Sequence, residues 1–281
     1  MKTILLLTDF SQTAMHAASF LQVIAHQIKA EKILIYHSCE TFSQEMIMIT
    51  DVLVPMPNDE RQILTDARSS LERIKSDLEG ALSDNVQVDV LMDKRPVITA
   101  VEEMTSDMDI ALIVLGICGI NDQGKNSVGK TPAMLMKHHQ FPLLIIPSSA
   151  PLAPITRIML ACELKDIEER LPVEALHKII QAFDASLYIV NVDKENAIGA
   201  AGFIKEQTAL HRLLGDLDPK FFYPENKDIV SGLLEFSTEH QIDLIIAVPK
   251  HRGFLEGLFH ESATRKLAVR AIKPLLLIHR Q

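Results

Sequence analysis

Short apolar runs alternate along the chain with longer segments whose apolar residues recur at helical spacing. The runs are rich in Val, Ile and Leu and are apolar on both faces, as in residues 111–115 (ALIVL) and 141–146 (FPLLII). In the helical segments the apolar positions are three or four residues apart, as at Leu64, Ala67 and Leu71. Strands without a polar face, separated by amphipathic helices, are typical of a parallel sheet covered by helices on both sides.

The whole pattern occurs twice. Residues 2–9 (KTILLLTD) correspond to residues 157–163 (RIMLACE), and Ile33 corresponds to Leu187, at a constant offset of 154 residues. The later strands correspond at an offset of 132, so the first copy carries 22 additional residues between its second and fourth strands. A repeat of this kind decides the architecture. We predict two tandem copies of an open five-stranded parallel sheet with helices on both faces, a Rossmann-like α/β fold.

The two copies meet at residues 147–154 (PSSAPLAP), where prolines and small residues favour an extended segment. This places the predicted domains at 1–150 and 151–281. The additional residues of the first copy include the methionine-rich insertion 42–57. Such a segment suits a flexible lid, a partner surface or an excursion packed on its own domain.

Composition excludes several classes of function. The chain has 281 residues and a formal net charge of −9, which argues against general affinity for nucleic acid or anionic membranes. The first residues form no secretory signal, because Asp9 interrupts a short apolar run, and no stretch is long enough to span a membrane. Three cysteines without CxxC spacing suit a reducing compartment. We therefore expect a cytoplasmic protein without nucleic-acid or membrane partners.

The candidate chemistry lies in a glycine-rich loop that follows the fourth strand of the first copy. Its glycines stand at positions 116, 119, 124 and 129, and a helix is expected to begin near Thr131. Glycines let backbone N–H groups approach an anion, and a helix N-terminus adds the positive end of its dipole. The loop therefore suits phosphate binding, although glycines that serve only tight turns would give the same pattern.

Residues 124–131 (GKNSVGKT) also match the Walker A motif. The context opposes this interpretation, because eight residues separate Leu115, taken as the last residue of the strand, from Gly124. Pro132 directly after Thr131 favours Thr131 as a helix cap over a Lys-Thr pair inside the helix. The nearest apolar run ending in aspartate, residues 188–193, belongs to the other copy. A P-loop ATPase or kinase is thus an alternative with less support.

The spacing G-x2-G-x9-G, formed by Gly116, Gly119 and Gly129, resembles the universal stress protein family. The resemblance extends over both copies and includes the acid after the opening strand (residues 5–11, LLLTDFS) and the closing Pro-strand (residues 141–147, FPLLIIP). It implies an adenine nucleotide alpha hydrolase-like fold and a regulatory module that binds ATP or another adenine nucleotide, with or without Mg²⁺. It also implies that strands at Leu143 and Leu275 join the halves as a pseudo-dimer, or whole chains as a homodimer.

The first and fourth strands end beside each other if the strand order reverses between them, which is where ligands bind in open parallel sheets. The resemblance implies that Asp9 lies by the base and sugar, Ser38 near the base, and the glycines around the phosphates. Lys130 departs from the family pattern, which has a small hydroxyl residue there; its charge suits phosphate, whereas its bulk would close the site. The predicted cofactor site comprises Asp9, Ser38, Gly116, Gly119, Gly129, Lys130 and Thr131.

The second copy has lost this pattern. Val248, His251 and Glu261 stand where the first copy has its three glycines, and Glu163 replaces Asp9. Side chains now occupy positions where backbone would approach a ligand, and a carboxylate would face an anion. We expect no ATP there.

No catalytic residue, metal site or paired carboxylates stand out, so we expect at most weak ATPase activity. The leading hypothesis is a tandem universal stress protein that binds an adenine nucleotide in its first domain. The alternative is a stress-related interaction protein that binds no nucleotide and has an unknown protein partner.

Overall fold

The computed structural model describes residues 3–39, 46–49, 52–55, 60–118, 129–138, 141–192, 200–249 and 260–279. We call residues 1–150 the first half and 151–281 the second half. The elements of the first half are β1 (Thr3–Leu7), α1 (Gln12–Ile24), β2 (Lys32–Ser38), β3 (Met46–Ile49), β4 (Val52–Pro55), α2 (Glu60–Ala81), β5 (Gln87–Asp93), α3 (Val97–Asp107), β6 (Ile110–Ile117), α4 (Lys130–His138) and β7 (Leu143–Pro147). Those of the second half are β8 (Arg157–Ala161), α5 (Ile167–Arg170), α6 (Val173–Phe183), β9 (Ser186–Val190), α7 (Ala200–Leu214), a 3₁₀ turn (Gly215–Leu217), β10 (Lys220–Phe222), α8 (Ile229–Glu239), β11 (Leu244–Ala247), α9 (His260–Arg270) and β12 (Leu275–Leu277).

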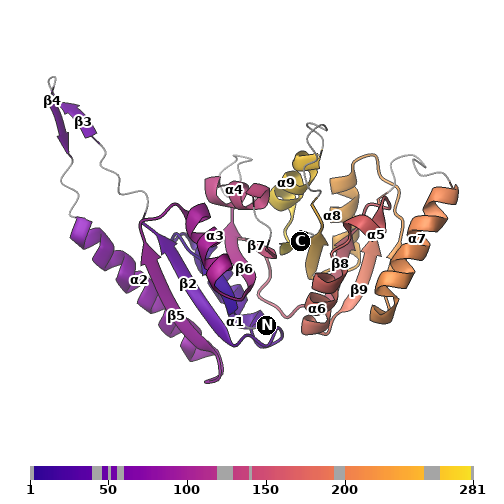
Figure 1. Cartoon of the computed structure of the whole chain (residues 1–281), viewed down its shortest axis with the longest axis horizontal. Coiled ribbons are helices and arrows are strands. Elements are labelled where there is room, and N and C mark those ends of the chain that lie inside the picture. The colour runs from indigo at the N-terminus through magenta and orange to yellow at the C-terminus, as the bar shows by residue number, and fades with distance from the viewer. Residues whose placement is uncertain are drawn as a thin grey trace.

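Ten strands form one sheet, in the order β10-β9-β8-β11-β12-β7-β6-β1-β2-β5. Within each half the five strands are parallel, and the order of the first half, β5-β2-β1-β6-β7, is repeated by its counterpart. The predicted fold class is therefore confirmed. Figure 1 shows this sheet running through the whole molecule with helices on both sides.

Two apolar cores cover the two faces of the sheet. One is built with residues of α1, α2, α6 and α7, and the other with residues of α3, α4, α8 and α9. Each core includes residues of both halves, because the strands are apolar on both faces; Leu144 and Leu160 belong to one core and Leu143 and Met159 to the other. Burial of these side chains is the main stabilising contribution to the fold.

The two halves are joined by an antiparallel pair in an otherwise parallel sheet. Leu275, Leu276 and Leu277 of β12 pair with Ile145, Leu144 and Leu143 of β7. These are the strands that we expected to connect the halves. Helices α4 and α9 lie side by side at this join (Figure 1). The pseudo-dimer thus exists within one chain, and a homodimer of whole chains stays a prediction.

The segment between the halves is anchored to the region of α1. The imidazole Nε2 of His16 lies 2.8 Å from the Ala150 carbonyl oxygen and donates to it. The Gln27 amide makes two bonds of 3.0 Å with Ile155, one to its carbonyl oxygen and one from its N–H group. Ile155 is 1% exposed. The connection is therefore packed against the first half.

Replacing Gln27 by alanine should lower the free energy of unfolding by about 1–3 kcal/mol, because it leaves the N–H and C=O groups of a buried residue without partners. Chemical denaturation followed by circular dichroism measures this change. Gln22→Ala is the control, since that amide makes one exposed bond to the Asp77 carbonyl oxygen. Equal stability of the two variants would show that the anchor contributes nothing.

The insertion of the first half contributes a separate two-stranded sheet. β3 and β4 pair antiparallel, with Met46 opposite Pro55 and Ile49 opposite Val52. Figure 1 shows this hairpin apart from the ten-stranded sheet. Residues 42–45, 50–51 and 56–57 of the insertion lie outside the described residues. In the described ranges, no helix combines the length and apolar character that crossing a membrane requires.

Candidate functional site

The strand order changes direction between β1 and β6, which lie side by side at the centre of the first half. From β1 the chain proceeds to β2 and β5 on one side, and from β6 to β7 on the other. In open parallel sheets ligands bind at such a point, outside the carboxyl ends of the strands, where the chain connections diverge to opposite sides. The predicted site residues Asp9, Ser38 and Gly116 all come from this edge.

The turn between β1 and α1 is tightly organised. Asp9 is exposed, and its Oδ1 accepts a 3.0 Å hydrogen bond from the Ser11 N–H group. Ser11 is the N-cap of α1, and its Oγ accepts from the Ala14 N–H group at 3.2 Å. Between them Phe10 has φ 63°, a left-handed conformation that is strained for an aromatic residue. The strained turn holds the Asp9 carboxylate at the carboxyl end of β1.

His37, near the end of β2, supports the same turn. Its Nδ1 lies 2.8 Å from the Thr8 carbonyl oxygen and must donate, because a carbonyl only accepts. Its ring also packs on Phe10, with centroids 4.3 Å apart. In the second half the Asn191 amide donates to the Cys162 carbonyl oxygen at 3.0 Å, in the corresponding place. This bond is thus common to both halves and belongs to the fold.

The packing of α1 on β6 explains why position 116 is a glycine. It lies within β6, which continues to Ile117, and not at the start of the loop as we predicted. A Cβ at this position would be 2.2 Å from the backbone oxygen of Thr13 and 2.9 Å from the backbone nitrogen of Ala14. Glycine is therefore required for the close approach of α1 to β6, whatever the site binds.

The helix after the loop begins one residue earlier than expected. Lys130 and Thr131 are the first two residues of α4, and the Gly129 carbonyl oxygen accepts from the Ala133 N–H group. The prediction of Thr131 as a helix cap was wrong, because proline at the third position is compatible with a first helical turn. Lys130 is exposed. One objection to the Walker interpretation is thereby removed, but residues 118–123 still separate β6 from Gly124.

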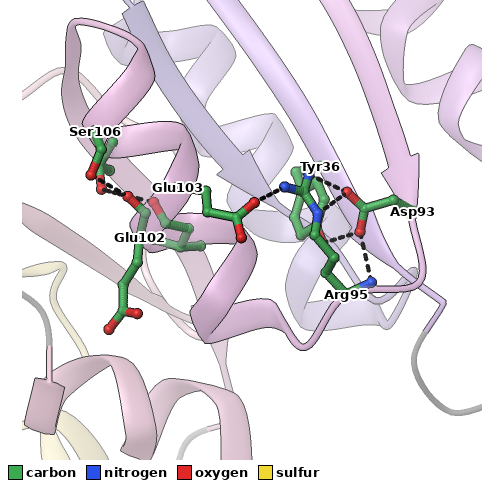
Figure 2. Close-up of polar contacts among 8 residues, drawn as sticks. Tyr36, Asp93, Arg95, Glu102, Glu103 and Ser106 are labelled. Atoms are coloured by element: carbon green, nitrogen blue, oxygen red, sulfur yellow. Dashed lines mark hydrogen bonds and ion pairs between the residues drawn. The ribbon is translucent and has the colours of Figure 1, made fainter.

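Sequence reasoning missed a polar network beside Ser38. Figure 2 shows Arg95 between the carboxylates of Asp93 and Glu103, with the Tyr36 ring behind. The Tyr36 hydroxyl donates to Asp93 Oδ1 at 2.8 Å, and Arg95 Nε donates to Asp93 Oδ2 at 2.8 Å. Ser38 Oγ donates to the Arg95 carbonyl oxygen at 2.7 Å. Ser38 is thus tied to the loop after β5.

The charges of this network are set by its hydrogen bonds. Partial burial opposes ionisation of Asp93, but the bonds from Arg95 and Tyr36 outweigh it and lower the pKa of the carboxyl. Burial, together with the bond to Asp93, raises the pKa of the Tyr36 hydroxyl. Asp93 therefore stays a carboxylate and Tyr36 a donor at neutral pH. The sequence signal that could have indicated this network is the group of polar residues at the end of a strand, at the edge of the sheet where ligands bind.

The corresponding place in the second half is built differently. Val248 occupies the position of Gly116, so a helix cannot approach β11 as α1 approaches β6. The helix is split there: α5 ends at Arg170 and α6 begins after Pro172. Glu206 of α7 accepts a 2.9 Å bond from the Ile167 N–H group and so places a carboxylate at the start of α5. That the second half binds no phosphate stays a prediction.

Several sequence predictions lie outside the described residues: Gly119, the first part of the Walker-like string (residues 124–128), His251, and Asp193 after the strand β9. The Glu261 side chain is likewise not described. Within the ranges that the structure does describe, no group of three His, Cys, Asp or Glu side chains is arranged to hold a metal ion.

Comparison with known proteins supports the fold. No family model and no curated protein matches the sequence. A universal stress protein from Archaeoglobus fulgidus DSM 4304 has a similar structure, with a TM-score of 0.73 and 14% identity over 99% of this chain and 98% of that one. A functionally unknown protein from Pseudomonas aeruginosa PAO1 matches with a TM-score of 0.60 and 13% identity, over 99% and 92%. The cytoplasmic domain of a prokaryotic cation chloride cotransporter matches with a TM-score of 0.56 and 11% identity, over 98% of this chain and 94% of that one.

Proposed function

We propose, on the premise that the chain has the tandem universal stress protein fold, that its first half binds an adenine nucleotide, ATP in the first instance, with or without Mg²⁺. The chain would act in the cytoplasm as a regulatory binding module of a stress response. The similarity to a cotransporter domain means that the fold alone does not give this function. The proposal therefore depends on the site.

The observation that carries the proposal is the switch point of the strand order between β1 and β6 in the first half. Helix α1 follows β1 after a short turn, and helix α4 follows β6 after the glycine loop. Two helix N-termini therefore belong to the same edge of the sheet. Lys130 is exposed in the first turn of α4. This exposure favours the role in which its charge attracts phosphate over the role in which its bulk closes the site. Asp9 is exposed in the turn after β1, where it can meet the hydroxyls of a ribose.

Equilibrium binding tests the proposal on the full chain. With a dissociation constant of about 10 µM, 1 mM ATP adds about 2.7 kcal/mol to the stability of the folded state. For a chain of this size, the melting temperature should rise by about 5–10 °C. Absence of a shift at millimolar ATP, with and without Mg²⁺, would leave the interaction protein as the better hypothesis.

The Lys130→Ala variant separates the proposed site from a P-loop. In a P-loop the lysine contacts the β- and γ-phosphates, so its removal should abolish binding. In the proposed site Lys130 adds only charge near the phosphates, and ATP should bind a few-fold more weakly. Isothermal titration calorimetry distinguishes the two results.

A further inference from the structure

Arg95 lies in the loop between β5 and α3 (residues 94–96), and each of its polar groups makes a hydrogen bond to a neighbouring residue. The backbone N–H group donates to Asp93 Oδ1 at 2.9 Å, and the backbone oxygen accepts from Ser38 Oγ at 2.7 Å. The guanidinium donates to both Asp93 and Glu103. We call Ser38, Asp93, Arg95 and Glu103 the Arg95 clamp, of which Figure 2 labels the last three. The clamp connects the end of β2, the end of β5 and helix α3.

The clamp borders the proposed site. Ser38 and Asp93 are paired at the last position of the β2–β5 ladder. β2 lies next to β1, whose carboxyl end leads to Asp9. The loop of residues 94–96 therefore lies at the same edge of the sheet, on the β2 side of β1. A nucleotide whose phosphates lie at the glycine loop would place its base toward this loop.

The second half shows that the fold does not require the clamp. Val190 and Val192, which have no hydrogen-bonding side chains, stand in the places of Tyr36 and Ser38. There the loop between β10 and α8 is tied to its helix by other residues: the Asn226 amide donates to Glu235 Oε2 at 2.9 Å, and Asn226 Oδ1 accepts from the Asp228 N–H group at 2.9 Å. One fold thus holds the corresponding loop with two different sets of polar bonds. The set that is built on an arginine occurs in the half that has the glycine loop.

The clamp is also not needed to hold α3 on the sheet. Ala100, Val101 and Met104 of that helix are buried in the core. The side chains of Arg95 and Glu103 are 39% and 49% exposed, and ion pairs with such exposure contribute little to stability. What the clamp does fix is the path of the loop: Asp93 and Ser38 bond to the Arg95 backbone, and the guanidinium ties the loop to Asp93 and Glu103.

We propose that Arg95 is a positioning residue of the nucleotide site: by clamping the loop between β5 and α3 it preforms the wall against which the base lies. This inference depends on the proposed function. Arg95 does not touch the phosphates in this arrangement, and its guanidinium is already engaged by two carboxylates. Its loss should therefore weaken ligands that carry a base and leave phosphate binding intact.

The test uses ATP, adenosine and inorganic tripolyphosphate as ligands of the full chain. For Arg95→Gln we expect the dissociation constants of ATP and adenosine to rise about tenfold, because a loosened support misplaces the groups that contact the ligand. The constant for tripolyphosphate should change less than twofold. Arg212→Gln is the matched control, since it removes the same charge from an exposed pair with Glu168 in the second half, and it should bind all three ligands like the wild type.

The outcomes separate the two proposals. If the wild type does not bind ATP, the proposed function falls, and this inference with it. If the wild type binds ATP and Arg95→Gln binds it equally well, only the positioning role is overturned. An equal loss for ATP and tripolyphosphate would also overturn it, because it would make Arg95 a phosphate ligand. Should Arg95→Gln not fold, Glu103→Gln removes only the outer bond and should weaken ATP two- to threefold, again without affecting tripolyphosphate.

Discussion

Replacing Gly116 by alanine is expected to lower the free energy of unfolding by about 3 kcal/mol or more. The added methyl group would be 2.2 Å from the backbone oxygen of Thr13 and 2.5 Å from its carbonyl carbon. Backbone cannot move aside as the end of a flexible side chain can, so α1 must shift away from β6. That shift disturbs the turn that holds Asp9 as well as the core beneath the helix. Urea denaturation measures the loss.

The matched control is Gly129→Ala. A Cβ at that position has Pro132 Cδ as its nearest neighbour, at 3.4 Å, which is ordinary van der Waals contact. The substitution should cost less than about 1 kcal/mol. If ATP binding is lost in this stable variant, glycine at position 129 serves the ligand, whereas glycine at position 116 serves the packing. Similar stability of the two variants would contradict the role assigned here to Gly116.

Placing a carboxylate at Leu276 is expected to disrupt the join between the halves. Leu276 is 1% exposed, at the centre of β12, between Leu144 of β7 and Ile246 of β11. An Asp side chain at this place has no described basic group as a partner in the two flanking strands and should cost more than about 4 kcal/mol. Scanning calorimetry should show a lower melting temperature and, because the two cores lose their shared strands, separate transitions for the halves.

Leu152→Asp is the control for the same change of charge and side chain. Leu152 lies in the segment between the halves and is 50% exposed, so its replacement should change stability by less than about 0.5 kcal/mol. A Leu276→Asp variant that unfolds in one transition, at the temperature of the control, would show that the β7–β12 pair does not couple the halves.

The strands of the ten-stranded sheet could be predicted because their signal is local and repeated. Runs such as residues 111–115 are apolar on both faces, and the offsets located each strand of the second half from its counterpart. The pairing at Leu143 and Leu275 came from the resemblance, since nothing local distinguishes the last strand of a sheet from a central one. The packed connection was not expected, because the partners His16 and Gln27 are ordinary polar residues in sequence.

The candidate site was harder to predict than the fold. A glycine pattern cannot tell a backbone that approaches a ligand from a backbone that approaches a helix, and at Gly116 the structure supplies the second reason. The Arg95 clamp was missed because its members, from residue 38 to residue 103, come together only through the β2–β5 register. The start of α4 at Lys130 was missed by one residue, because proline is compatible with several positions of a first turn.

The antiparallel β7–β12 pair has a genetic consequence. In a dimer of identical chains, one codon specifies both copies of a site, so any substitution appears in both at once. In this chain each copy has its own codons, while the pair keeps the two copies together in a fixed one-to-one ratio. Gly116 can therefore persist in one copy while its counterpart is Val248. Selection can therefore act on the first half for ligand binding and on the second half for its packing against the first.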